Sequence, residues 1–153
     1  MIALDIGAGS HFTHVPRAVN INATVKTDVL LTDENRWFID VVCDVQYLPF
    51  RDNIFDVVFC SHVIEHTENP LLSLKEVLRV TKADGVAEVC TPYRFSNDAK
   101  SVQHKHYFNK KWFLKTLRHF HIRVNYRPRP NAGLTLSIPP IPIELHVIIC
   151  KKY

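Results

Sequence analysis

The sequence predicts an α/β domain of the Rossmann-like, doubly wound type, built on a mostly parallel sheet of about seven strands. Two observations predict it. Strand-like segments alternate with helical ones, and several of the strand-like segments are near-continuous apolar runs, as is typical of parallel strands covered on both faces. The chain has 153 residues, the size of one domain, and we expect residues 1–153 to form it. The segments expected as strands are 2–6, 18–23, 39–43, 55–60, 86–91, 122–127 and 145–151.

A first helix is predicted between the fourth and fifth strands. An Asn-Pro pair at 69–70 marks its start, since asparagine caps helices and proline suits the first helical position. Leu71, Leu74 and Leu78 then repeat at helical spacing. We expect these three leucines to form the buried stripe and Gly85 to lie just past the helix end.

A second helix is predicted to open at Asn109, with Phe113, Leu117 and Phe120 on one face. Prolines crowd residues 128–142 after it, which leaves no room for a crossover helix before the last strand. We therefore expect the last strand to run antiparallel to its neighbours.

Composition is that of a globular protein, with 46% hydrophobic and 22% charged residues. No apolar run approaches the ~20 residues that a membrane span requires. Cys43, Cys60, Cys90 and Cys150 each lie within or at the end of an apolar run and show no C-x-x-C spacing. This pattern predicts buried free thiols and a cytoplasmic location.

Charge divides the chain into two parts. Residues 1–93 hold 7 Lys and Arg against 13 Asp and Glu, a net charge of −6, whereas residues 94–153 hold 12 against 2, a net charge of +10. Aromatic residues are interleaved with the basic ones, a combination that suits phosphates and stacked bases. We expect the segment from Arg94 to Tyr153 to face nucleic acid or another acidic partner, with a solvated helix face as the alternative.

The most informative segment follows the first strand, where Asp5, Gly7 and Gly9 lie in a short turn. Open α/β sheets bind ligands at the carboxyl ends of their strands, and glycines there let the backbone approach a ligand closely. A dinucleotide-binding turn would need a third glycine at the position of Phe12.

Further segments follow in a fixed order. The chain contains DVQYLPF at 44–50, FDVV at 55–58, VIEH at 63–66 and RVTKADG at 79–85. Together with DIGAG at 5–9, they resemble the class I S-adenosylmethionine-dependent methyltransferases over about residues 2–92. The resemblance implies S-adenosylmethionine as cofactor and methyl transfer to an acceptor (small molecule, nucleic acid or protein) that the sequence does not identify.

The resemblance also implies which residues bind the cofactor. The first loop, with Asp5, Gly7 and Gly9, would hold its methionine part, and Ser61 at the end of the fourth strand would line the pocket near the sulfonium. The remaining positions lie at the ends of the second and third strands. They are Asn22 for the ribose, Asp44 for the adenine amine and Val45 for a backbone N–H.

Three departures from the family pattern bear on function. Asn22 stands where the family usually has a carboxylate, so we expect weaker cofactor binding, because a neutral hydrogen bond is weaker than a charge-assisted one. Residues 10–17 are too few for a full crossover helix. The N-terminal helices that often cover the active site have no counterpart, so we expect an open cleft. With the apolar loop at 138–143, this predicts a homodimer.

Two histidines are candidates for the catalytic base, which is needed only if the acceptor is protonated. His62 lies nearest the expected methyl position, and His66 belongs to the Glu-His pair of the family. No metal site is predicted, because the remaining paired histidines lack cysteine or carboxylate companions at ligand spacing. Those histidines are His104, His106, His119 and His121.

A rival hypothesis is a non-catalytic module with the cofactor fold that serves as a binding or scaffolding partner. Asn22, the short first connection and the expected lack of a cap over the cleft favour it. Retention of Asp5, Gly7, Gly9 and Asp44 argues against it, since a scaffold has no physical need for that loop.

Overall fold

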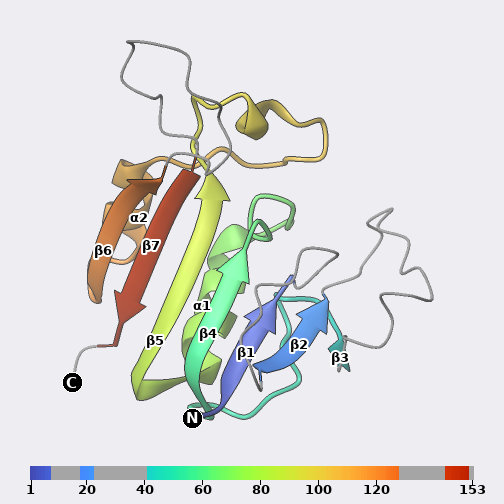
Figure 1. Cartoon of the computed structure of the whole chain (residues 1–153), viewed down its shortest axis with the longest axis vertical. Helices are drawn as coiled ribbons and strands as arrows, with labels where there is room; N and C mark the ends of the chain where they lie inside the picture. Colours follow the sequence, from blue (N-terminus) through green and yellow to red (C-terminus); the bar gives the residue numbers. More distant parts are fainter. Residues whose placement is uncertain (8–17, 23–40, 128–143, 152–153) are drawn as a thin grey trace.

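The structure, a computed structural model, describes residues 1–7, 18–22, 41–127 and 144–151. It contains a seven-stranded sheet with the order β3-β2-β1-β4-β5-β7-β6 (Figure 1). The strands are β1 (Ala3–Ile6), β2 (Ala18–Asn22), β3 (Val41–Val42), β4 (Phe55–Ser61), β5 (Thr81–Pro92), β6 (His121–Arg127) and β7 (Glu144–Cys150). The predicted α/β class with a mostly parallel sheet is confirmed.

Strand direction follows the sequence prediction. β3, β2, β1, β4 and β5 pair in parallel, and β7 lies between β5 and β6 and runs antiparallel to both. After β1 the chain builds outward through β2 and β3, then returns to the other side of β1 with β4. The sheet therefore has a topological switch point between β1 and β4, the place where open α/β sheets bind ligands.

Helix α1 (Pro70–Val80) begins where the sequence predicts. The Asn69 side chain accepts a hydrogen bond from the backbone N–H of Leu72 at 3.1 Å, which satisfies one of the free donors of the first turn. Leu74 and Leu78 pack into the core, but Leu71, predicted to share their stripe, is 47% exposed. The buried face of α1 starts one turn later than the leucine spacing suggests.

The position of Gly85 also differs from the prediction. Helix α1 passes directly into β5 at Thr81, so Gly85 lies inside that strand rather than beyond a helix end. A Cβ atom at Gly85 would lie 2.8 Å from the carbonyl oxygen of Asp56 and 3.0 Å from Cγ2 of Thr81. The glycine is needed because the backbones of β4 and β5 approach each other closely here, at an irregularity in their pairing.

Arg79, in the last turn of α1, holds the segment that leads into β4. Its guanidinium donates to Glu76 (2.6 and 2.7 Å), to Asp52 (2.6 Å) and to the carbonyl oxygens of Leu48 (3.0 Å) and Phe50 (2.7 Å). The hydrogen bond from Arg79 holds the pKa of the Glu76 carboxyl below its usual range. This network fixes the amino-terminal entry to β4.

Helix α2 (Lys110–Thr116) opens at Asn109 as predicted, and the Asn109 side chain accepts from the N–H of Trp112 at 2.8 Å. Phe113 and Leu117 are buried and Phe120 is partly buried, in agreement with the predicted face. Figure 1 shows α1 and α2 on the same face of the sheet. The loop after β5 contains a short 3-10 helix, η2 (Asp98–Lys100).

Several sequence predictions lie outside the described residues: Gly9, the short connection at 10–17 and the apolar loop at 138–143. All four cysteines are described and none forms a disulfide. Cys60 is buried as predicted, whereas the other three are only half-buried. Among the described residues, no helix combines the length and apolarity that crossing a bilayer would require.

The two leucines of α1 provide a matched test of its buried face. Leu74→Ala should lower the free energy of unfolding by about 2–5 kcal/mol, because it leaves a cavity under the helix. Leu71→Ala, in the same helix but exposed, should change it by no more than about 0.5 kcal/mol. Urea unfolding followed by circular dichroism measures both, and equal effects of the two substitutions would contradict the orientation of α1.

Candidate functional site

The residues predicted to bind a ligand follow the carboxyl ends of parallel strands. Ile6 of β1 pairs with Cys60 of β4, and Asn22 of β2 pairs with Val42 of β3. The carboxyl ends of these strands therefore meet at one edge of the sheet. The predicted positions at or just beyond this edge are Asp5, Gly7, Asn22, Asp44, Val45, Ser61 and His62.

The turn after β1 has the geometry that the glycine spacing suggests. Gly7 adopts φ +79°, the left-handed region that favours glycine. A Cβ atom there would lie 2.1 Å from Cγ2 of Val63, which follows β4. Asp5 lies just before the turn and is 2% exposed. The first loop and the segment after β4 therefore pack tightly against each other at the switch point.

Asp44 follows β3 and is held in a fixed position. Its carboxylate accepts from the backbone N–H of Gln46 at 2.8 Å and from the Gln46 side-chain amide at 3.1 and 3.2 Å. The Gln46 side-chain oxygen in turn accepts from the N–H of Asn69, the cap of α1, at 2.9 Å. Val45 is buried. Gln46, which the sequence does not single out, orients the carboxylate while leaving it acceptor capacity for a ligand.

His62 follows Ser61, the half-buried last residue of β4, and takes an unusual backbone conformation with φ +54°. Its Nε2 lies 3.2 Å from Oε1 of Glu144, and its Nδ1 lies 3.4 Å from Oε1 of Glu65. The hydrogen bond to Glu144 and the nearby carboxylate of Glu65 raise the pKa of His62 to about 10. An imidazole that is protonated at neutral pH cannot accept a proton, which counts against the predicted role of His62 as a general base.

His66 directly follows Glu65 in the chain, and one of its ring nitrogens lies within 4.8 Å of a Glu65 carboxylate oxygen. Its Nδ1 is 3.1 Å from the carbonyl oxygen of Gln103, and its ring packs edge to face on His104 with 4.7 Å between centroids. The predicted histidines thus flank one buried carboxylate, Glu65, which is 1% exposed.

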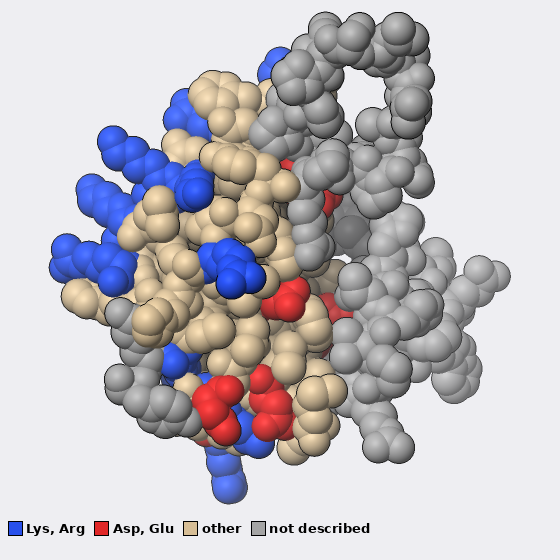
Figure 2. Space-filling model, turned by 60° about the vertical axis from the view of Figure 1, so that its left-hand side comes forward, with Lys and Arg blue, Asp and Glu red and all other residues tan. Residues whose placement is uncertain are grey.

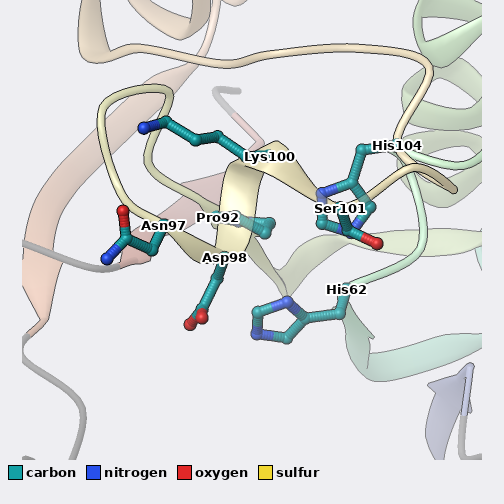
Figure 3. A pocket seen from close by; sticks show the side chains of 7 residues that line it. All are labelled: His62, Pro92, Asn97, Asp98, Lys100, Ser101 and His104. Atoms are coloured by element: carbon teal, nitrogen blue, oxygen red, sulfur yellow. The ribbon is translucent and has the colours of Figure 1, made fainter.

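A cavity of about 470 Å³ opens at this edge (Figure 3). His62 is the predicted site residue among its lining, and Pro92 at the end of β5 also lines it. The rest comes from the loop after β5, where Figure 3 shows Asp98 directed toward the space beside His62. The additional lining residues are Asn97, Asp98, Lys100, Ser101 and His104. The only sequence signal for them is a polar segment directly after a buried strand.

The strand order, the switch point and the glycine turn define a Rossmann-like α/β protein with its ligand site between the ends of β1 and β4. A sequence model described as "Methyltransferase domain" matches residues 4–89. The chain belongs to this family, the class I S-adenosylmethionine-dependent methyltransferases.

Curated relatives are similar over part of their length. Demethylmenaquinone methyltransferase of Corynebacterium glutamicum is 36% identical over 96 residues, which are 58% of this chain and 42% of that protein. An uncharacterized protein of Methanocaldococcus jannaschii is 33% identical over 88 residues, which are 55% of this chain and 37% of that protein. The chain therefore matches these relatives over about two fifths of their own length.

Solved structures share the fold. A SAM-dependent methyltransferase from Thermotoga maritima superposes with a TM-score of 0.73 at 19% identity, over 98% of this chain and 82% of that chain. A SAM-dependent methyltransferase from Archaeoglobus fulgidus gives a TM-score of 0.68 at 16% identity, over 98% and 86% of the two chains.

The contact between Gly7 and Val63 can be tested with a double-mutant cycle. Gly7→Ala should destabilise the protein by at least about 1–2 kcal/mol, because an L-residue is strained at positive φ and its Cβ overlaps Val63. Combining it with Val63→Ala should give a smaller loss than the sum of the two single losses, with a coupling of at least about 0.5 kcal/mol. Urea unfolding of all four proteins measures the coupling, and additive losses would contradict the contact.

Proposed function

We propose that the chain binds S-adenosylmethionine at the carboxyl edge of β1–β4 and transfers its methyl group to an acceptor. The observation that carries the proposal is the left-handed Gly7 turn at the switch point of a chain of this family. When bound, the cofactor supplies a methyl group on a positively charged sulfur. The protein then needs to position the two reactants and to supply a suitable field.

The arrangement of the described residues supports a site for the adenosine part. Asp44 follows β3 with its carboxylate oriented by Gln46, and Asn22 ends the neighbouring β2. In this proposal Asp44 accepts from the adenine amine, Val45 donates its backbone N–H, and Asn22 binds the ribose more weakly than a carboxylate would. Asp5, Gly7 and Gly9 surround the methionine part.

The charges around His62 also suit this cofactor. Protonated His62 stands between the carboxylates of Glu65 and Glu144, so the three groups together carry a net negative charge. A negative group near the carboxyl end of β4 attracts a sulfonium. In this proposal His62 holds the two carboxylates in place through its two ring nitrogens, while the role of His66 as a base stays a prediction.

Asp44 provides the sharpest test of cofactor binding. Asp44→Asn should weaken S-adenosylmethionine binding at least about fivefold, or about 1 kcal/mol, because a neutral amide replaces the charged acceptor. Asp52→Asn is the matched control. Asp52 precedes β4 and pairs with Arg79 away from the proposed site, so this change should leave the affinity for S-adenosylmethionine unchanged. Calorimetric titration measures both.

A methyl-transfer assay then distinguishes an enzyme from a non-catalytic scaffold. It measures transfer of a labelled methyl group to small hydroxyl, amino and thiol compounds, to RNA or to proteins. Label transfer in at least one of these assays supports the enzyme. Cofactor binding with no transfer to any of them would favour the non-catalytic module, and the absence of binding by the unmodified protein would contradict the proposed site.

A second proposal concerns nucleic acid as acceptor or partner. Helix α2 and the turn after it expose four basic side chains, Lys110, Lys111, Lys115 and Arg118. Figure 2 brings the side of β6 and α2 forward, and along one side of this view Lys and Arg side chains follow one another without an Asp or Glu between them. A continuous basic surface of this kind attracts the phosphate backbone.

The basic face predicts salt-dependent binding. If four to six Lys and Arg residues neutralise phosphates, log affinity should fall against log salt with a slope of about −3 to −5. Replacing Lys110, Lys111 and Lys115 by Gln should flatten the slope and leave cofactor affinity unchanged. Fluorescence anisotropy of a labelled oligonucleotide over a salt series measures the slope. No binding at low salt would remove nucleic acid as a partner.

We also propose a cytoplasmic location and a homodimer. The absence of a disulfide among the four described cysteines supports a reducing compartment. The homodimer rests on the apolar sequence at 138–143.

A further inference from the structure

Three side chains with metal-binding atoms lie together beside the cavity. Glu65 and His66 follow β4, and His104 comes from the loop after η2. One ligand atom from each residue lies within 4.8 Å of the others. We propose that Glu65, His66 and His104 bind a divalent transition-metal ion such as Zn²⁺. This site goes beyond the proposed methyl transfer and does not depend on it.

Glu65 is the first argument for a cation. Its side chain is 1% exposed, and neither carboxylate oxygen has a hydrogen-bond partner among the described residues. Nδ1 of His62 forms an ion pair with Oε1 at 3.4 Å, and Oε2 has no hydrogen-bond partner among the described residues. A buried carboxylate without hydrogen bonds is costly, and coordination of a metal ion is one of the few ways to compensate it.

The orientation of the two histidines is the second argument. Nδ1 of His66 lies 3.1 Å from the carbonyl oxygen of Gln103, and Nδ1 of His104 lies 3.2 Å from that of Ala99. A carbonyl oxygen only accepts, so each Nδ1 must carry the proton and donate it. In a neutral imidazole this leaves Nε2 with a free lone pair. Metal-binding histidines are typically oriented by such a hydrogen bond from the other ring nitrogen.

The backbone holds the two loops together at this point. The carbonyl oxygen of Glu65 accepts from the N–H of Lys105 at 2.8 Å and from the N–H of His106 at 3.2 Å. These bonds place the residue next to His104 against Glu65, so the three side chains are brought together before any ion binds. A site assembled in this way needs little rearrangement to bind a metal.

The ligand set indicates the kind of ion. Two imidazoles and one carboxylate suit zinc, iron and other first-row metals, whereas Ca²⁺ and Mg²⁺ prefer oxygen ligands throughout. Three protein ligands leave at least one position open, as in catalytic rather than structural zinc sites. His104 also lines the cavity, so the ion would border the space beside His62. His66 would then bind an ion instead of accepting a proton.

The test uses Zn²⁺ and Co²⁺ with the chelator-treated full chain. Calorimetry should show one Zn²⁺ per chain, Zn²⁺ should raise the unfolding temperature, and Co²⁺ should give visible absorption bands of a nitrogen-coordinated site. His104→Gln, which replaces a half-buried side chain in an exposed loop, should weaken Zn²⁺ binding at least about tenfold, and Glu65→Gln should do the same. The second substitution keeps the shape of the buried side chain, and circular dichroism verifies that both variants are folded.

His119→Gln is the matched control, because His119 is exposed in the turn after α2 and outside the cluster. It should bind Zn²⁺ as the unmodified chain does. Absence of Zn²⁺ binding by the unmodified chain would overturn the proposal. Equal affinity of the His104→Gln and His119→Gln variants would also overturn it, since binding would then arise from scattered surface histidines. None of these readouts depends on methyl transfer.

Discussion

The parallel pairing of β4 with β1 is the constraint on which the rest of the structure depends. Leu4 and Ile6 of β1 and Val58 and Cys60 of β4 are all fully buried. A shift of one residue would turn these side chains to the opposite face, so the register is strongly specified. That register brings the Gly7 turn against the segment after β4 and thereby determines the shape of the ligand edge. Cofactor loop, histidines and cavity all follow from it.

The sequence alone predicts the features that depend on local interactions. Asn69 and Asn109 cap their helices because a side-chain oxygen reaches an N–H three residues ahead, which is visible in any sequence. The apolar runs predict buried parallel strands, and the proline-rich stretch predicts the antiparallel β7. Gly85 could not be placed in this way, since it is required by the carbonyl oxygen of Asp56 on a neighbouring strand. Leu71 is exposed because the position of α1 against the sheet, rather than its own periodicity, determines its buried face.

At the site, the sequence predicts which strand ends meet but not what their side chains do. The protonated state of His62 depends on Glu144, 82 positions away, and on Glu65. The link from Asp44 through Gln46 to the cap of α1 likewise joins segments that sequence spacing does not connect. The Glu-His pair at 65–66 is visible as a motif, whereas its approach to His104 requires the loop after β5. The charge of His62 and the grouping of Glu65, His66 and His104 therefore emerge only from the tertiary structure.

The loop after β5 explains why the cavity has fixed walls. Tyr93 forms a parallel bridge with Phe108, and the N–H of Arg94 donates to the carbonyl oxygen of Phe108 at 3.0 Å, which closes the loop at its base. Further along, the N–H of Lys105 donates to the carbonyl oxygen of Glu65, and the Lys105 side chain pairs with Glu68. The loop is thus held at its base and against the segment after β4. A ligand that enters the cavity meets walls that are already ordered, so its binding does not have to overcome the entropy of ordering them.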